Sequence, residues 1–415
     1  MFAACYPVTA PNMKKTSIAL LAALLMGCSA PLRRGAVPEK FRPLYAELDA
    51  ELSAAEAAVA AMPDTGGARP LSAPGLYPAS SYFTGLAAPG GAGWLRLTAM
   101  LDALRAAGAG GVSVMISLPD LTPEARDNAA VLDFYAALAA EVRKRGMKLL
   151  VEHFVYPPSG GPQGKFAAAI KASPDPRAAY LGFKRREAEL VISRIRPDYF
   201  TAVSEPDTCA RFLGFSVTAD EYADWLRGLL ASPAAAAAGS GVKIGAGAGV
   251  WEDPAYPRAF AGVKGLAYVD LHFYPLKLGG EDLFARLLAD IDAVRAVSPG
   301  LPVVISETWL YKHGAAEPKG VFDPEAYGRN PYSFWAPLDA RFLALLFDLG
   351  RKRGIELISP YFAQYFFYAE DYSPDKPQAG WPASLLPEWR RAGAAASRGE
   401  LTPLGRAFGR ISGGK

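Results

Sequence analysis

Cysteine and histidine are the scarcest chemically versatile residues of this 415-residue chain, which contains three of each. Cys5 and Cys28 lie in the N-terminal segment, so Cys209 is the single thiol of the remaining chain. One thiol excludes an intrachain disulfide and a cysteine-based zinc site in that part. No histidine stands near Cys209 in the sequence, which favours a buried, unreactive thiol over a nucleophile.

An excess of charge of one sign is also missing, because the formal net charge is only +3. No basic cluster is longer than the RKR run at 143–145, which stands ahead of Gly146 as is typical of a helix C-terminus. We therefore do not expect nucleic acid as a partner. Hydrophobic residues make up 51% and charged residues 20%, which indicates a globular chain with one large domain or two ordinary ones.

The N-terminal apolar run TSIALLAALLMG is too short to cross a bilayer but suits the core of a signal peptide. Lys14 and Lys15 precede it, and the run LMGC at 25–28 resembles the bacterial lipobox. That resemblance implies a leader over residues 1–28 and lipidation of Cys28. We expect a lipid-anchored protein of the bacterial cell envelope, on its periplasmic or cell-surface side. An ordinary signal peptide or a buried helix is the alternative.

Beyond residue 28, we predict a polar tether and one helix over residues 29–74, followed by a single domain over 75–415 that ends in a helical extension. In this domain apolar strand patterns alternate with amphipathic helix patterns, several of which end in Arg or Lys followed by Gly. The eight predicted strands lie near residues 79–84, 111–117, 148–155, 199–203, 242–247, 267–272, 302–306 and 356–362. This alternation predicts an α/β fold, a closed (β/α)8 TIM barrel.

A doubly wound open sheet is the competing architecture. It would normally carry a glycine-rich phosphate turn after an early strand. The run GAGAGV at 245–250 lies mid-chain and lacks the third glycine of a GxGxxG frame. Its small residues more plausibly let a helix or a substrate approach a barrel strand closely.

Two predicted strands end at a glutamate, where a turn residue would be usual. Glu205 follows the strand that ends at Val203, and Glu307 ends the run VVISE. A third strand ends in the motif HFYP, which contains His272 and Tyr274. In a TIM barrel such strand ends meet at the face that carries the active site.

This order of motifs resembles the clan A glycoside hydrolases, the retaining enzymes that include endoglucanases and mannanases. The resemblance covers about residues 75–365. It implies that Glu205 is the acid/base and Glu307 the nucleophile. It also implies that Tyr274 hydrogen-bonds the nucleophile, and that His272 is its near neighbour in the cleft.

Two glutamates suit this chemistry for a physical reason. One carboxyl group must be protonated to donate to the leaving oxygen, and the other must be ionised to attack the anomeric carbon. The two carboxyl groups of a retaining enzyme lie about 5 to 5.5 Å apart. A hydrogen bond from Tyr274 is expected to keep Glu307 ionised.

The sequence departs from the family at two places. Ser204 stands where the family commonly has an asparagine that contacts the sugar 2-hydroxyl, and the tryptophan that often follows the eighth strand is missing. Polar and aromatic side chains at or near the predicted strand ends are the candidate substrate contacts: Ser204, His153, His272, Tyr274, Trp251, Trp309, Trp335, Tyr361 and Gln364. A core position for His153 is an equal alternative. Glu152 and Glu252 are interpreted as structural ion-pair partners, although Glu252 could line a subsite.

Two other functions remain open. Ser204 leaves room for a non-catalytic lipoprotein that binds glycan or organises the envelope. His153, His272 and His313 come from three strand ends and could converge on a metal, but the His-x-His motif common in barrel zinc hydrolases is missing. We expect a monomer that needs no metal or organic cofactor and acts on an oligo- or polysaccharide of unspecified sugar and linkage.

Overall fold

The computed structural model describes residues 36–76, 89–122, 128–155, 161–274, 276–314, 317, 324–375 and 385–413. The leader with Cys28 and the segment 79–84 lie outside these residues, so the expected lipid anchor stays a prediction. None of the helices within the described ranges is long and apolar enough to span a membrane.

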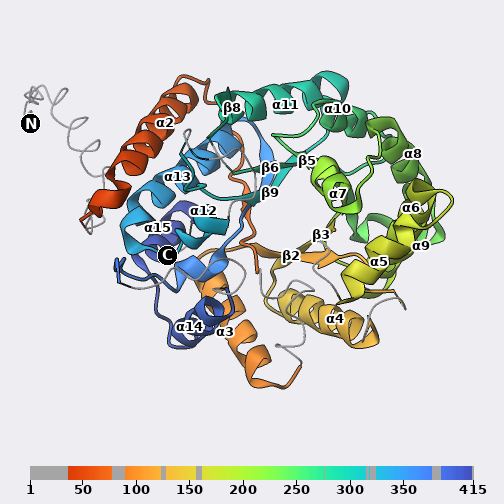
Figure 1. Cartoon of the computed structure of the whole chain (residues 1–415), viewed down its shortest axis with the longest axis horizontal. Helices are drawn as coiled ribbons and strands as arrows, with labels where there is room; N and C mark the ends of the chain where they lie inside the picture. The colour runs from red at the N-terminus through yellow and green to blue at the C-terminus, as the bar shows by residue number, and fades with distance from the viewer. Residues whose placement is uncertain are drawn as a thin grey trace, which may run out of the picture.

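Eight parallel strands form a (β/α)8 barrel, as the sequence predicts (Figure 1). They are β1 (Leu71–Ser72), β2 (Gly111–Ser117), β3 (Lys148–Phe154), β4 (Tyr199–Val203), β5 (Lys243–Gly249), β6 (Tyr268–Phe273), β9 (Val303–Thr308) and β10 (Ile355–Pro360). The order around the barrel is β1-β10-β9-β6-β5-β4-β3-β2. Backbone bonds from Gly110 N to Ser72 O (2.9 Å) and from Leu76 N to Ser113 O (2.8 Å) close the ring between β1 and β2.

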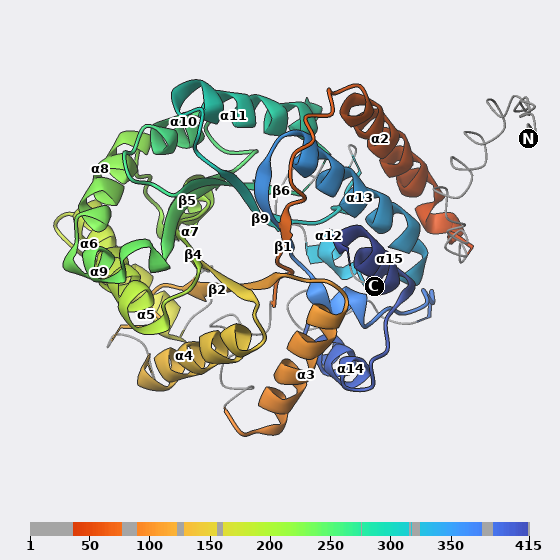
Figure 2. The ribbon, with the colours of Figure 1, turned by 180° about the vertical axis from the view of Figure 1, so that it is seen from behind.

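The first strand is the one element that the sequence misplaces. It pairs with β10 at Leu71–Ser72, within the stretch predicted as tether and N-terminal helix (Figure 2). With only two residues in the sheet ladder, β1 is too short for an apolar run to mark it. The other seven strands lie within a few residues of their predicted positions.

Helices surround the barrel as an outer ring (Figure 1). In chain order they are α3 (Ala92–Ala106), α4 (Asn128–Lys144), α5 (Gly161–Lys171), α6 (Pro176–Leu190), α7 (Pro206–Leu213), α8 (Ala219–Leu230), α9 (Pro233–Ala238), α10 (Ala255–Ala261), α11 (Leu283–Val297), α12 (Pro324–Gly328), α13 (Ala336–Lys352), α14 (Leu385–Ser397) and α15 (Pro403–Ser412). A small hairpin of β7 (Lys277–Leu278) and β8 (Glu281–Asp282) follows β6.

The predicted N-terminal helix exists as α2 (Arg42–Ala60), which packs along α13 on the outside of the barrel (Figures 1 and 2). The ring of Tyr45 stacks on Trp335, with their centroids 5.6 Å apart. Arg341 of α13 pairs with Asp49 and with Glu56 of α2. The helix is therefore part of the same hydrophobic core as the barrel.

Both faces of each strand are covered, because alternate side chains point into the barrel and toward the helices. The glycines of β5 show how the interior is filled. A Cβ added at Gly245 would lie 2.3 Å from the Tyr268 ring, and one at Gly247 would lie 2.3 Å from the backbone oxygen of Asp270. Gly245 and Gly247 therefore make room for residues of β6, and not for a helix or a substrate, while a Cβ at Gly249 would meet the Trp251 ring.

Candidate active site

Glu205 lies at a sharp turn between β4 and α7. Its backbone has φ 43° and ψ 67°, a left-handed conformation that costs a residue other than glycine about 1 to 3 kcal/mol. Pro206 follows at the first position of α7, where its missing N–H has no intrahelical partner to lose. The turn directs the side chain of Glu205 to His272, and only 7% of the residue is exposed.

Glu252, just after β5, braces this turn. Its carboxylate accepts hydrogen bonds from the N–H of Thr208 in the first turn of α7 (2.8 Å) and from the N–H of Gly249 (2.9 Å). Burial, together with the nearby charge of Glu205, raises the pKa of Glu252 to about 8. Glu252 is therefore not an ion-pair partner, as the sequence suggests, but a cap that ties α7 to the end of β5.

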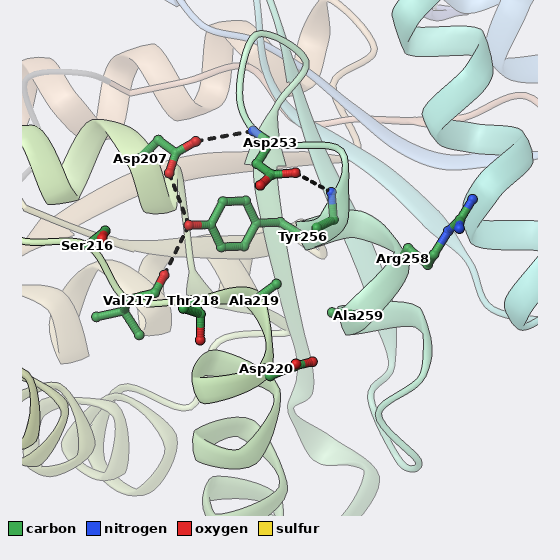
Figure 3. Close-up of a pocket in the computed structure, with 11 residues that line it drawn as sticks. Asp207, Ser216, Val217, Thr218, Ala219, Asp220, Asp253, Tyr256, Arg258 and Ala259 are labelled. Carbon is green, nitrogen blue, oxygen red and sulfur yellow. Dashed lines mark hydrogen bonds between the residues drawn. The ribbon is translucent and has the colours of Figure 1, made fainter.

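A second link holds the same two loops together, as Figure 3 shows. Asp207 accepts hydrogen bonds from the Asp253 N–H (3.1 Å) and from the Tyr256 hydroxyl (3.0 Å). The open cleft beside it has a volume of about 680 Å³, and its lining includes Asp220 and Arg258 but neither Glu205 nor Glu307. These contacts fix the loop that carries Glu205 from its outer side.

Glu307 belongs to β9 and is buried to 4% exposure. The hydroxyl of Tyr274 donates a hydrogen bond to its Oε2 at 2.5 Å. One carboxyl oxygen each of Glu205 and Glu307 and one ring nitrogen of His272 all lie within 4.8 Å of one another. Four of the residues predicted at strand ends, Glu205, His272, Tyr274 and Glu307, are thus brought together.

His272, completely buried, is the centre of this group. Its Nδ1 lies 2.8 Å from Glu205 Oε1 and 3.7 Å from Glu307 Oε2. On the other side of the ring, Nε2 lies 2.9 Å from the Ser306 hydroxyl and 3.1 Å from Glu152 Oε2. One imidazole therefore separates the two candidate catalytic acids from a third buried glutamate.

The electrostatics differ from the expectation for Glu307. Burial raises its pKa well above the ordinary value, and the charges of Glu152 and Glu205 add to this, while a cationic His272 and the Tyr274 hydroxyl lower it. For His272, burial lowers the pKa, but the surrounding carboxylates outweigh it and hold the pKa well above its ordinary value. Tyr274 and the imidazolium both favour the ionised form of Glu307, but together they do not offset the effect of burial on its pKa.

Three aromatic side chains near these acids keep part of their surface exposed: Trp251, Tyr361 and Tyr327. The rings of Trp251 and Tyr361 contact Tyr274, with centroid distances of 6.0 and 5.8 Å. Tyr327 of α12 lies close enough to Glu307 and Glu205 for their charges to raise its pKa. These rings can offer apolar faces to a sugar, as predicted for Trp251 and Tyr361.

Several predicted contacts lie elsewhere, which corrects the sequence interpretation. His153 is fully buried on the outer side of β3, where its Nε2 lies 3.1 Å from Glu187 Oε2 of α6. Trp335 packs against α2, as described above. Trp309, only 2% exposed, is enclosed by rings that include Phe362 and Tyr365. All three are core residues. Trp309 and Trp335 fill space between the barrel and its helices, as large apolar rings commonly do, and His153 joins β3 to α6 through Glu187.

Ser204 and Gln364 are each 1% exposed, so a substrate would not reach them without rearrangement. The Ser204 hydroxyl lies 3.5 Å from His272 Nε2, so it faces the buried imidazole. Cys209 is buried as expected, and burial raises the pKa of its thiol to about 12.

The three histidines do not converge on a metal. Among the described residues, the groups with metal-ligand spacing are Glu152, Asp270 and His272, and Glu205, His272 and Glu307. Both are rich in carboxylates and share His272, so a divalent cation there would occupy the catalytic pair itself. His153 and His313 belong to neither group.

The sequence does not predict that four further residues lie close to His272 or to the two candidate catalytic acids: Glu152, Asp270, Ser306 and Tyr327. Asp270 and His272 are two positions apart in β6 and face the same side, a periodicity that points to Asp270 once His272 is singled out. Glu152 gives no such signal, since both faces of β3 are buried and its sequence KLLVEHF does not alternate.

The eight parallel strands form a TIM barrel, and the acids at its strand ends lie where TIM-barrel enzymes carry their active sites. No protein-family model matches the sequence, and no curated protein is significantly similar to it. Solved structures do match. A GH5_18 protein from Bifidobacterium longum subsp. longum, in complex with Manβ1-4GlcNAc, is 14% identical with a TM-score of 0.54, over 83% of this chain and 78% of that chain. GH5_18 from Streptomyces cattleya, in complex with GlcNAc, is 16% identical with a TM-score of 0.52, over 83% and 80%. At these identities the likeness establishes the fold.

Proposed function

We propose that the protein is a retaining glycoside hydrolase that acts on an oligo- or polysaccharide with Glu205 and Glu307 as its two catalytic carboxyl groups. The observation that carries this proposal is the approach of both carboxyl groups to within 4.8 Å at one shared imidazole. Retaining enzymes need such a short separation, whereas inverting enzymes leave room for a water between the acids.

In the proposed reaction, a Glu307 oxygen attacks the anomeric carbon while Glu205 transfers its proton to the leaving oxygen, so the glycosidic C–O bond breaks. Water, deprotonated by Glu205, then displaces Glu307 and releases the sugar with its original configuration. A cationic His272 supports the first step, because it favours the ionised form of Glu307 in a buried site.

The test is a screen of aryl glycosides and polysaccharides with wild type beside Glu307→Gln, starting with Manβ1-4GlcNAc because a structural neighbour binds it. We expect turnover to fall roughly 10⁴-fold or more in the variant, as on loss of other catalytic nucleophiles, with little loss of stability. EDTA should leave wild-type activity unchanged. Equal activity of the two proteins would exclude the mechanism, and loss of activity in EDTA would favour a metal site.

A non-catalytic glycan-binding barrel is the second candidate, and the buried Ser204 favours it. A contact to the sugar 2-hydroxyl that strengthens in the transition state is lacking if Ser204 stays turned toward His272. Saturable glycan binding by a wild type that hydrolyses nothing in the screen would support this candidate.

We also propose that Cys28 carries a lipid anchor that holds the barrel at the bacterial cell envelope. The LMGC run supports this. Fractionation of cells that express the full chain or its Cys28→Ala variant tests the anchor. Equal membrane association of both proteins would exclude it.

A further inference from the structure

Glu152 is a third buried glutamate at this site, on the side of His272 that faces away from the catalytic pair. Its side chain is 2% exposed, and its Oε2 lies 3.1 Å from His272 Nε2. Among the described residues this oxygen accepts no hydrogen bond. A buried carboxylate oxygen without a donor is costly, unless a nearby positive charge compensates for it. The only cation-forming group this close to it in the described chain is His272.

The hydrogen bonds around Asp270 determine where the hydrogens of His272 lie. Asp270 accepts from the Ser306 N–H (2.9 Å), the Ser306 hydroxyl (2.5 Å) and the Thr201 hydroxyl (2.8 Å). A serine hydroxyl has one hydrogen, so the Ser306 oxygen presents a lone pair to His272 Nε2 at 2.9 Å. Nε2 therefore carries a hydrogen.

The other ring nitrogen then shares a single proton with Glu205. Across the 2.8 Å between Nδ1 and Glu205 Oε1, either a protonated Glu205 donates to a neutral imidazole, or an imidazolium donates to an ionised Glu205. A negative charge near Nε2 favours the second form, because it stabilises the cationic ring.

We propose that Glu152 is a positioning residue of the acid/base pair, and that its carboxylate holds on His272 the proton that Glu205 passes to the leaving group. The inference rests on the proposed function. It assigns a task to a residue that substrate does not touch.

One proton moves from His272 through Glu205 to the leaving oxygen. As the glycosidic bond stretches and negative charge develops on the leaving oxygen, Glu205 takes the proton from His272 Nδ1 and passes it to that oxygen, so Glu205 ends ionised as it began. The imidazole becomes neutral while Nε2 keeps its hydrogen. Attack by Glu307 removes the adjacent carboxylate charge at the same time, so the site no longer needs the cation.

Other charged and titratable groups face this histidine from β3, β6 and β9 and from the turn after β4, whereas β5 places Gly249 beside it. They are Glu152 of β3, Glu205 after β4, Asp270 of β6 with Tyr274 beyond it, and Glu307 of β9. Burial raises the pKa of Glu152 above its ordinary value, while its interaction with His272 lowers it. The carboxylate and the imidazolium therefore stabilise each other.

The direct test is ¹⁵N NMR of histidine-labelled protein, because the chain has three histidines and Gln variants of His153 and His313 assign the third. In wild type at pH 7 both nitrogens of His272 should be protonated. Glu152→Gln should lower the pH at which His272 loses its proton by about one unit, as for a charge removed within 4 to 6 Å. Glu152→Asp should restore most of that shift.

Glu187→Gln is the matched control, since it changes a glutamate buried equally well beside His153 and leaves the inner cluster intact. It should shift His153 and not His272. A neutral His272 in wild type at pH 7 would overturn the proposal even if no Glu152 variant folds. An unshifted His272 in Glu152→Gln would overturn it as well.

Kinetics separate this inference from the proposed function. Glu152→Gln should move both limbs of the pH profile of kcat/KM to lower pH by about one unit, since one buried negative charge affects both Glu307 and the His272–Glu205 pair. A lower maximum with unmoved limbs would mean a structural role and contradict the proposal. A protein that hydrolyses no glycan refutes the proposed function, whereas the NMR titration still decides whether Glu152 holds the proton.

Discussion

Glu152 and His153 are neighbours on β3, yet they belong to two clusters of opposite character. Glu152 points into the barrel, to the inner cluster formed with Glu205, His272 and Glu307. His153 points outward, to the outer cluster formed with Lys184 and Glu187 of α6. Both clusters combine a buried histidine with buried carboxyl groups, and one peptide unit of a single strand separates them.

The clusters differ in their balance of charge. The outer cluster has one carboxyl group and one amine, and Glu187 also accepts hydrogen bonds from the N–H groups of Leu121 (2.7 Å) and Thr122 (3.1 Å). Burial lowers the pKa of Lys184 to about 8 and that of His153 below its ordinary value. The inner cluster gathers several carboxyl groups around one histidine, and their charges raise the pKa of His272, whereas burial raises the pKa of a glutamate in both clusters.

The comparison shows that burial of a histidine does not by itself distinguish a catalytic role from a structural one. Groups whose protons can be redistributed occur where like charges are crowded at a barrel mouth. Groups that satisfy one another pairwise hold a helix against a strand. Substitutions that affect one cluster and spare the other test this distinction.

After Glu307→Gln, the largest effect is expected from Glu205→Ala. Natural glycans should lose roughly 10² to 10⁴-fold in kcat/KM, the range of general acid catalysis, because their leaving groups need a proton. Aryl glycosides with good leaving groups should lose far less in the first step. Steady-state rates on matched pairs of substrates measure this difference, and azide can rescue the variant by replacing water in the second step.

Equal losses on both substrate types would contradict the role of Glu205 as acid. Arg258→Ala, on the outer cleft next to the same loop, is the control and should leave both rates near wild type.

The sequence predicts the barrel well because seven of its strands are apolar runs between amphipathic helices. Glu205, Glu307, His272 and Tyr274 are also predictable, since a strand end fixes where a side chain emerges. The sequence does not tell which face a residue occupies in a strand that is buried on both sides. The sequence therefore leaves His153 equally open to a substrate contact and a core position, and it assigns Glu152 to a structural ion pair and not to the site.

The aromatic residues show the same limit. Trp309 and Trp335 follow polar strand ends as closely as Trp251 does, and only their packing against Tyr365 and Tyr45 removes them from the cleft. Tyr327 comes from a helix between β9 and α13 that no strand-end rule selects. Contacts that depend on tertiary packing are beyond a reading of local pattern.

In the outer cluster, the main effect should be on stability. Glu187→Ala leaves His153 Nε2 and two backbone N–H groups without their partner and removes a negative charge near Lys184, and should lower the free energy of unfolding by about 3 to 5 kcal/mol. Glu187→Gln keeps an acceptor oxygen and should cost less. Urea denaturation measures both. A shifted pH profile of kcat/KM in either variant would contradict the separation of the two clusters.

The smallest effect on catalysis is expected at Glu252, which lies beside Glu205 but is bonded only to backbone N–H groups. Its pKa is raised from 4.5 to about 8, so the folded protein binds a proton more tightly than the unfolded chain. Its contribution to stability is therefore complete below about pH 4.5 and is lost as the pH rises through about 8. Glu252→Gln cannot titrate, and its free energy of unfolding should fall less than that of wild type between pH 5 and 9, by on the order of 4 kcal/mol, since one pKa unit corresponds to about 1.4 kcal/mol. Urea titrations across this range measure the difference, and parallel pH dependences of the two proteins would show that Glu252 is ionised throughout and that crowding of like charge does not extend beyond the inner cluster.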